Sequence, residues 1–332
     1  TPIKSSAASD VYKRQSLELF KTQKFYQIDI SILKDLGYDV LLSNRIFDSL
    51  LFWKYDILFS YFYRYSFFAA LLAKCFGKKT YFTGGIDSLD SDYASAFNYK
   101  IQALFFKLCY WVADSCIIVS QSDLKNIFKV SSLKKKLSYS EHVINTKLFI
   151  ADVPKEKIFT SIVWMGDEGN VVRKGVDKAL QIFAELKKIP EFVDYRFVII
   201  GRKGEGEVLV RSIIDKYNLK GSVELKGEVS EEDKINLLKQ SKYYFQLSLY
   251  EGFGLAALEA LCANNIIIHS GKGGLANPIY KEQLLFDIDN DFDSELLKLV
   301  NKLACFTPIT SYDNLLELSL IHISEPTRHA QI

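Results

Sequence analysis

The chain has 332 residues, of which 48% are hydrophobic and 25% are charged, a composition typical of a soluble globular protein. A formal net charge of only +2, with no dedicated basic stripe, argues against a nucleic-acid-binding protein. Histidine is sparse, and the cysteines lie far apart with no CxxC pair, which argues against a zinc site or a disulfide framework. We expect buried thiols in a reducing compartment at Cys75, Cys109, Cys116, Cys262 and Cys305.

The two ends of the chain match each other at the level of their codons. Residues 10–15 (DVYKRQ) can be encoded by a DNA string whose reverse complement encodes LSLIHI, the sequence of residues 318–323. This inverted match resembles the transposase adapter used in sequencing libraries. We therefore expect residues 1–15 and 318–332 to be adapter-derived, and we exclude them from fold reasoning. Residues 16–317 are then expected to be a native fragment that lacks its first strand.

Short apolar runs alternate with amphipathic segments from residue 16 onward, as in stacked βα units. Aromatic residues are dense between residues 50 and 76, but Lys54, Asp56 and Arg64 interrupt them. No uncharged stretch there reaches the ~20 residues that a membrane span needs, so a buried strand followed by a helix is predicted. In the first half, the pattern predicts strands over 39–42, 55–62, 79–83 and 116–120, and helices over 25–36, 66–76, 99–113 and from Ser122 to about 129.

The second half of the chain restarts the same rhythm. Apolar residues recur on one helical face over 176–189, and Pro190 ends this helix. Ser230 opens a capping box for the helix predicted over 231–240. We predict strands over 162–165, 196–200, 223–226, 243–247 and 266–269, and helices over 176–189, 208–217, 231–240, 255–263 and 294–304. The pattern favours an α/β protein with two parallel-sheet domains, over residues 16–150 and 151–317.

The most informative motif lies where the fourth predicted strand of the second half meets the next helix. Glu251 follows the strand, and Gly252 and Gly254 come directly before the helix. Free backbone N–H groups and the positive end of the helix dipole form an anion site there, and glycines let a ligand approach the backbone closely. Glu259 comes eight residues after Glu251, about two helical turns further along. The two carboxylates could hold the sugar and the ribose of a nucleotide sugar, on either side of its diphosphate.

The segment SLYEGFGLAALEAL resembles the E-x7-E signature of glycosyltransferase family 4, and the likeness covers most of residues 16–317. The resemblance implies a GT-B fold, in which two Rossmann-like parallel-sheet domains face each other across a cleft, and a retaining reaction without an obligatory metal. It implies that Glu251 contacts the donor sugar and that Glu259 holds the ribose. The residues whose backbone is implied to bind the donor phosphates are Gly252, Phe253, Gly254 and Leu255.

Lys174 falls where the family's R…K-G pattern places a phosphate-binding lysine. A fixed cation at that place would stabilise the charge that gathers on the leaving diphosphate. The family's companion arginine usually follows the glycine at a strand end, but that position is Asp167 here, so Arg173 is the candidate substitute. The alternative is a basic helix start in solvent, without a role in binding.

Further candidates follow other predicted strands. Gly166 and Gly201 are expected to line the nucleotide pocket, and Gly274 belongs to a loop that resembles the one closing under the donor in this family. That loop departs from the family pattern at Asn277, where a glutamate is usual. In the first domain, Asp87 follows a strand end and is the candidate acceptor-side residue, with an Asx-type turn as the alternative.

The sequence therefore predicts a retaining hexosyltransferase that moves a sugar from a UDP- or GDP-sugar to a glycan or lipid-linked acceptor, in cell-surface polysaccharide synthesis. It needs no cofactor or metal in this interpretation. The predicted location is the cytoplasm, with peripheral contact of the N-terminal domain at the inner face of the membrane as an option. Three alternatives remain: a non-catalytic nucleotide-sugar binder, a nucleotide-sugar epimerase of the same fold, and an NAD-dependent dehydrogenase.

Overall fold

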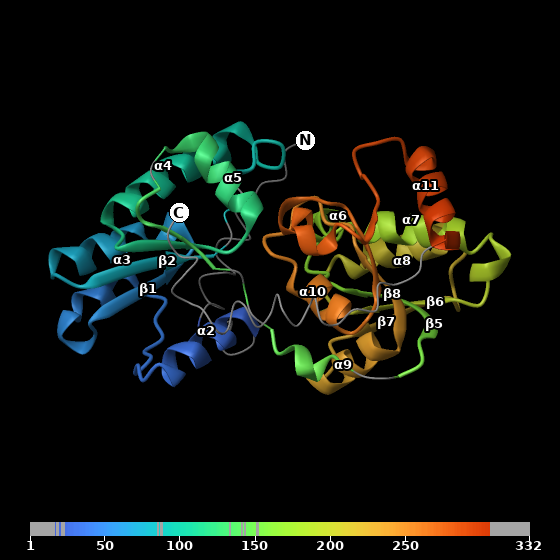
Figure 1. Ribbon diagram of the computed structural model, residues 1–332, viewed down its shortest axis with the longest axis horizontal. Coiled ribbons are helices and arrows are strands. Elements are labelled where there is room, and N and C mark those ends of the chain that lie inside the picture. The colour runs from blue at the N-terminus through green and yellow to red at the C-terminus, as the bar shows by residue number, and fades with distance from the viewer. Residues whose placement is uncertain are drawn as a thin grey trace. The chain divides into compact units, whose positions relative to one another are not determined.

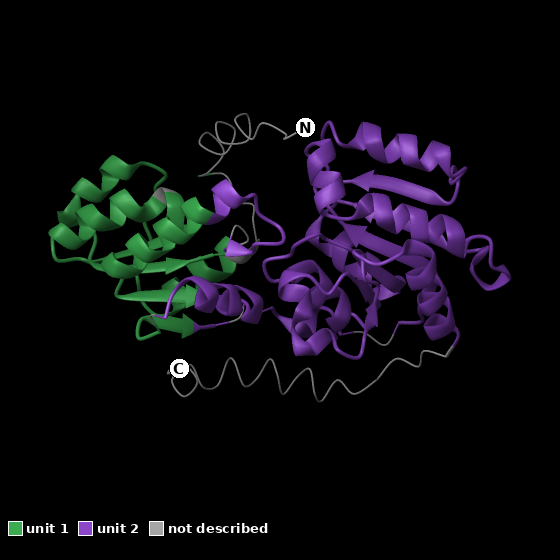
Figure 2. Ribbon diagram, turned by 90° about the horizontal axis from the view of Figure 1, so that it is seen from above, with its two compact units in different colours: residues 1–84, 100–117, 133–138 green, residues 85–99, 118–132, 139–332 purple. Residues whose placement is uncertain are grey.

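A computed structural model describes residues 17, 20, 24–84, 86, 89–132, 134–140, 142, 144–150 and 153–305 of the chain. The two ends predicted to be adapter-derived, and the candidate Asp87, lie outside these residues. The chain forms two compact units (Figure 2), which are described separately below. Unit 1 comprises residues 1–84, 100–117 and 133–138, and unit 2 comprises residues 85–99, 118–132 and 139–332.

The first half of the chain builds a four-stranded sheet in the order β1-β2-β3-β4 (Figure 1). Strands β1 and β2 pair in parallel, with Ile57 opposite Lys79 and Tyr61 opposite Thr83, and β2 pairs in parallel with β3. The strands are β1 (Ile57–Tyr61), β2 (Lys79–Thr83), β3 (Ser115–Ile118) and β4 (Leu137–Tyr139). The helices are α2 (Lys24–Asp35), α3 (Tyr63–Cys75), α4 (Ala96–Val112) and α5 (Gln121–Val130), with short 3-10 helices η1 (Ile46–Leu50), η2 (Phe52–Lys54) and η4 (Thr146–Leu148).

Three predictions for this half of the chain are wrong. Residues 39–42 form no strand, because no neighbouring strand pairs with their backbone, and Leu41 is 70% exposed. Ser120, not Ser122, caps α5: its backbone is extended, and its hydroxyl accepts a 3.0 Å hydrogen bond from the Asp123 N–H. Cys75 is exposed near the end of α3, whereas Cys109, Cys116 and Cys262 are buried as predicted.

The second half builds a six-stranded parallel sheet in the order β10-β9-β8-β5-β6-β7. Its strands are β5 (Glu156–Ile162), β6 (Arg196–Ile200), β7 (Val223–Gly227), β8 (Ser241–Gln246), β9 (Ile266–His269) and β10 (Leu284–Leu285). Its helices are α6 (Glu168–Arg173), α7 (Val176–Leu186), α8 (Glu207–Lys216), α9 (Glu231–Gln240), α10 (Leu255–Cys262) and α11 (Phe292–Cys305), with short 3-10 helices η5 (Pro190–Phe192), η6 (Gly273–Ala276) and η7 (Pro278–Tyr280). The predicted α/β class with parallel sheets is confirmed.

Helices cover both faces of this sheet (Figure 1). Residues of α7, α8 and α11 pack into one core, and residues of α9 and α10 into the core on the opposite face. Alternation along β8 explains the division, because Tyr243 and Phe245 join the first core and Tyr244 the second. The Phe159 ring stacks on Tyr243 and Phe245 at centroid distances of 4.6 and 5.0 Å, which ties β5 to β8.

Sequence patterns located most elements of this half, including the Ser230 cap, whose hydroxyl accepts from the Asp233 N–H at 3.0 Å. The strand predicted over residues 162–165 instead spans Glu156–Ile162, because its first residues are polar and obscured the alternation. The helix α6 and the two-residue strand β10 were not predicted. Within the described residues, no helix is long and apolar enough to span a membrane.

Candidate active site at the carboxyl edge of the second sheet

The order of the strands places a topological switch point between β5 and β8. From β5 the chain moves outward to β6 and β7, and then returns to β8 on the other side of β5. Ligands of open parallel sheets bind beside such a switch point, outside the carboxyl ends of the strands. The loops that follow β5 and β8 carry the predicted site residues Lys174 and Glu251. The fold therefore brings together two residues that are far apart in the sequence.

Close backbone contacts hold these loops together. Gly175 has a φ of +67°, and a Cβ at this position would lie 2.0 Å from the Leu247 carbonyl oxygen. Gly273 has a φ of +61°, and a Cβ there would lie 2.1 Å from the Glu251 carbonyl oxygen. Gly274 donates its N–H to the same carbonyl oxygen at 2.6 Å. Only glycine fits positions with this backbone and this spacing, so the loops after β5, β8 and β9 form one packed edge.

Lys174 and Glu251 form an ion pair at this edge. The Lys174 Nζ lies 2.8 Å from the Glu251 Oε2, and the two side chains are 20% and 16% exposed. Two more groups donate to the same oxygen: the Gln246 Nε2 at 3.1 Å and the Ser248 Oγ at 3.0 Å. Burial alone would raise the pKa of Glu251, but the charge and hydrogen bond of Lys174, the Ser248 hydroxyl and the charge of Arg173 together hold this pKa below its usual value. Glu251 is therefore an anion at neutral pH.

Arg173 and Lys174 lie between two helices, at the carboxyl end of α6 and directly before the N-cap of α7, Gly175. Arg173 is the last residue of α6 and Lys174 its C-cap, where positive charge complements the helix dipole. The Arg173 guanidinium donates to the Asn170 Oδ1 at 2.6 Å. Asp167, which stands where the family pattern has arginine, caps the same helix by accepting from the Asn170 N–H at 2.6 Å. The departure at this position thus has a local structural role.

Glu259 lies on α10 and is nearly covered. Its side chain is 4% exposed, and its Oε2 lies 2.8 Å from the Nζ of Lys234 on α9. Lys234 also lies 3.0 Å from the Oε2 of Glu231. The proposed contact of Glu259 with a ribose remains a prediction. Any such ligand would share the carboxylate with Lys234.

The remaining predicted donor-binding residues surround this edge. Gly254 is the left-handed N-cap of α10 and has no side-chain capping bond, so the helix begins with backbone N–H groups at Leu255 and beyond. The Phe253 ring packs edge-on against His142 at a centroid distance of 5.3 Å.

The predicted glycines after β5 and β6 make backbone hydrogen bonds. The Gly166 carbonyl accepts from the Glu205 N–H at 3.1 Å, and the Gly201 N–H donates to the Gly227 carbonyl at 2.8 Å. Gly252 has open space where a Cβ would stand.

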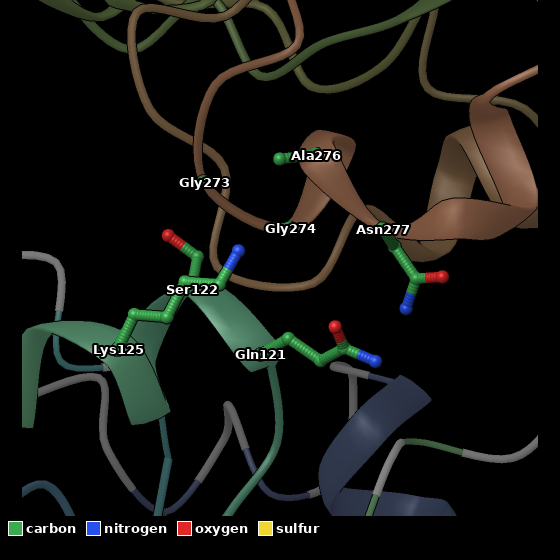
Figure 3. Close-up of a pocket in the computed structure, with 7 residues that line it drawn as sticks. All are labelled: Gln121, Ser122, Lys125, Gly273, Gly274, Ala276 and Asn277. Atoms are coloured by element: carbon green, nitrogen blue, oxygen red, sulfur yellow. The ribbon is translucent and has the colours of Figure 1, made fainter.

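A small pocket of about 110 Å³ lies within unit 2 next to Gly273 and Gly274. Figure 3 shows Gln121, Ser122 and Lys125 of α5 on one side of it and the loop from Gly273 to Asn277 on the other. Ligand sites for whole drug-sized molecules measure about 300–1,000 Å³, so this pocket could hold only part of a nucleotide sugar. Asn277, the second departure from the family pattern, caps η7 by accepting from the Ile279 N–H at 3.0 Å.

In the part of the chain that the structure describes, no group of three or more His, Cys, Asp or Glu side chains is placed to hold a metal ion. The short Asp90-Ser91-Asp92 sequence forms a turn, because the Asp90 Oδ1 accepts from the backbone N–H groups of Asp92 and Tyr93 at 2.9 and 3.2 Å. The Asp90 carboxylate therefore stabilises the local backbone.

Sequence reasoning missed three polar residues that hold the two motif glutamates: Gln246, Ser248 and Lys234. A signal for two of them was present, because Gln246 and Ser248 are polar residues at the end of an apolar strand, where burial requires hydrogen-bond partners. Lys234 lies 25 positions from Glu259 on another helix. Nothing in the local sequence predicts that pair.

Part of the chain is similar in sequence to known proteins. Residues 169–303 match the family model for glycosyl transferases group 1. The chain is 32% identical over 144 residues to a GDP-mannose:cellobiosyl-diphosphopolyprenol alpha-mannosyltransferase of Xanthomonas oryzae pv. oryzae, a match that covers 37% of this chain and 37% of the relative. The matched part is thus well under half of this relative.

Solved structures give the fold. The sucrose-phosphate synthase from Thermosynechococcus elongatus superimposes with a TM-score of 0.60 at 20% identity, covering 76% of this chain and 65% of that one. Anabaena HepE in complex with UDP-glucose superimposes with a TM-score of 0.63 at 13% identity, covering 86% of this chain and 77% of that one. The chain has the GT-B fold of glycosyltransferases. The sequence matches support glycosyl transfer as its chemistry.

Proposed function

We propose that this chain is a retaining glycosyltransferase that takes a hexose from a nucleotide diphosphate sugar. The observation that carries the proposal is the Lys174–Glu251 ion pair, which places a cation and an oriented carboxylate 2.8 Å apart beside the switch point of a parallel sheet. A diphosphate needs the cation, and sugar hydroxyls need the carboxylate. A nucleotide sugar offers both groups next to each other.

Lys174 can serve the donor without leaving Glu251. An ammonium group has three N–H donors, and within the described residues only Glu251 accepts one of them. The other two can bind diphosphate oxygens. The backbone N–H groups at the start of α10 and the charge of Arg173 would add to the positive field at the leaving group.

In the proposed reaction, the bond between the anomeric carbon and the diphosphate oxygen breaks while Lys174 stabilises the departing charge. The acceptor hydroxyl oxygen bonds to the anomeric carbon on the same face, and its proton passes to the departing diphosphate. Glu251 orients the sugar through its hydroxyls. We propose a glycan or lipid-linked acceptor and a role in cell-surface polysaccharide synthesis, because the mannosyltransferase relative is named for a diphosphopolyprenol-linked acceptor.

The first test uses the whole chain and two donors of different nucleotide and sugar. Calorimetric titration with UDP and GDP would show whether a nucleotide binds, and GDP-mannose and UDP-glucose would be tested for hydrolysis and for transfer. Saturable binding of one nucleotide together with turnover of its sugar supports the proposal. Binding without turnover favours the non-catalytic binder, and binding of neither nucleotide overturns both interpretations.

The non-catalytic binder is the second candidate because two family positions have other functions here. Asp167 and Asn277 stand where the family pattern has arginine and glutamate, and each caps a short helix. The phosphate end of the site keeps Lys174 and the start of α10, so nucleotide binding would survive these departures. Catalysis depends on whether Arg173 replaces the missing arginine.

A further inference from the structure

The carboxyl end of β8 buries polar side chains on the way to Glu251. Tyr244, Gln246 and Ser248 are 0%, 4% and 0% exposed. A buried polar group without a partner destabilises a fold by about 1–3 kcal/mol, so a run of them requires a complete set of hydrogen bonds. The structure supplies these hydrogen bonds, and the last of them is accepted by the carboxylate of Glu251.

Donors and acceptors in this network follow one direction. The Ile162 N–H donates to the Tyr244 hydroxyl at 3.2 Å, and the Tyr244 hydroxyl donates to the Gln246 Oε1 at 3.2 Å. A backbone N–H can only donate, so the single hydroxyl proton of Tyr244 is available for Gln246. Burial, with the charges of Glu251 and Glu259, raises the pKa of Tyr244, which keeps that proton in place. The amide of Gln246 therefore has one orientation, with its oxygen toward Tyr244.

The fixed amide then directs its NH₂ group at Glu251. The Gln246 Nε2 donates to the Ser248 Oγ at 2.8 Å and to the Glu251 Oε2 at 3.1 Å. Ser248 and Lys174 donate to the same Oε2 at 3.0 and 2.8 Å. Among the described residues, no group donates to the Glu251 Oε1, and the side chain is 16% exposed. Three donors thus hold one carboxylate oxygen and leave the other for a ligand.

We propose that Gln246 is a positioning residue, oriented by Tyr244, that holds the Glu251 Oε2 so that the Oε1 faces the hydroxyls of the donor sugar. The proposal rests on the proposed function, because it gives Glu251 a sugar to bind. Gln246 itself touches no donor atom in this scheme. Its effect on the reaction passes through Glu251.

The first experiment separates positioning from folding. In Gln246→Leu, an apolar side chain replaces the amide and both N–H donors are lost, so kcat for the donor that the wild type turns over should fall on the order of 10- to 100-fold. The affinity for UDP or GDP should stay within about threefold, because no proposed phosphate contact involves Gln246. Parallel loss of kcat, nucleotide affinity and melting temperature would assign Gln246 a structural role and overturn the proposal.

Tyr244→Phe tests whether Tyr244 acts through Gln246. Loss of the hydroxyl frees the Gln246 amide to rotate, so a smaller fall in kcat is expected alone and none when the Gln246→Leu change is already present. Additive effects in the double variant would show that Tyr244 does not act through Gln246.

Gln246→Glu gives a readout that a structural role would not move. The new carboxylate would stand about 3 Å from Glu251, and two carboxylates at that distance cannot both ionise easily. The shared proton should move the acid limb of the kcat/KM profile to higher pH. A profile that coincides with that of the wild type would overturn the proposal.

A measurement without a donor tests the Tyr244–Gln246 hydrogen bond independently of the reaction. In the wild-type protein the two Gln246 side-chain NH₂ protons should give distinct NMR signals, with exchange slowed by burial, and Tyr244→Phe should shift or broaden them. Unchanged signals would overturn the proposal that Tyr244 orients Gln246. Turnover of neither GDP-mannose nor UDP-glucose by the wild type, with these signals as expected, would instead count against the proposed function alone.

Discussion

The two glutamates of the motif are eight residues apart and are each paired with a lysine at 2.8 Å, yet their surroundings differ. Glu251 lies in a loop at the carboxyl edge of the sheet, is 16% exposed and has three donors on one oxygen. Glu259 lies within α10, is 4% exposed and has its partner, Lys234, on a neighbouring helix. One glutamate of the motif thus presents an oriented and partly accessible carboxylate, whereas the other forms a covered ion pair.

This difference has a physical origin in the fold. A loop at the end of β8 can receive donors from the strand before it and from the loop after β5, because β5 and β8 are neighbours. Glu259 lies in the middle of α10, where Lys234 of the neighbouring helix α9 pairs with it. We therefore expect changes at Glu251 to alter the reaction, and changes at Glu259 to alter nucleotide affinity and stability together.

The largest effect is expected from Glu251→Ala. Loss of the oriented carboxylate should lower kcat on the order of 100- to 1,000-fold, while UDP or GDP binds with nearly unchanged affinity. Glu259→Ala leaves the partly buried Lys234 without one carboxylate, so it should lower the melting temperature and nucleotide affinity. Steady-state kinetics, calorimetry and thermal melting of both variants would test this contrast. Identical profiles for the two variants would abolish the distinction.

The lysine partners of the two glutamates should also differ in their effects. Lys174→Met removes the main cation that lowers the pKa of Glu251, so this pKa should rise and the acid limb of kcat/KM should shift to higher pH. The rate at neutral pH should also fall on the order of 100-fold, because the leaving diphosphate loses its cation. Lys234→Met should leave the acid limb in place. An unshifted limb in Lys174→Met would show that Glu251 is not the titrating group.

The loop that supports Glu251 gives a smaller effect on stability. In Gly273→Ala, a Cβ would stand 2.1 Å from the Glu251 carbonyl oxygen at a φ of +61°, so the backbone must move. We expect a loss of about 2–3 kcal/mol in the free energy of unfolding, together with lower kcat. Gly252→Ala is the control for stability, because no atom lies within 4 Å of its Cβ position. Denaturant unfolding of both variants measures the difference, and equal losses would contradict this explanation.

Much of the fold could be predicted from the sequence because its βα rhythm is local. Pro190, the Ser230 capping box and the apolar runs at β6 and β9 each mark an element within a few residues. The strand predicted over 39–42 was wrong, because a strand exists only where another strand pairs with it, and pairing is not a local property. The helix α6 escaped prediction because it spans only six residues and exposes polar side chains.

In the candidate site, too, residues within one segment could be predicted from sequence, whereas contacts between segments could not. Spacing within one segment predicted Glu251, the glycines and Glu259, because a loop and the helix after it are contiguous. Lys174 was placed only through the family resemblance, and its 2.8 Å approach to Glu251 depends on the neighbouring positions of β5 and β8. Gln246 could not be assigned a role from sequence. Its function depends on which of its two amide ends faces Glu251, and Tyr244 decides that only in the folded chain.

The smallest effect concerns a buried group at the same edge that is kept neutral, in contrast to Glu251. Burial lowers the pKa of His269 to about 4, and it lowers that of His142 to about 4. A histidine whose folded pKa lies below the ordinary 6.5 binds fewer protons in the folded state than in the unfolded state. Stability should therefore fall as the pH drops from 7 toward 4, by about 2 kcal/mol per histidine between pH 7 and pH 5.

His269→Phe tests this and sharpens the contrast with the motif carboxylate. The phenyl ring can keep the packing against Tyr280, whose ring centroid lies 5.6 Å from that of His269, but it cannot be protonated. The variant should lose about half of the stability change between pH 7 and pH 5, with His142 supplying the rest. The window lies above pH 4.5, the ordinary pKa of glutamate, and Glu251 titrates lower still, so this carboxylate contributes little to it. Urea unfolding at the two pH values measures the change, and an unaltered pH dependence in the variant would show that His269 is not the group that acid protonates.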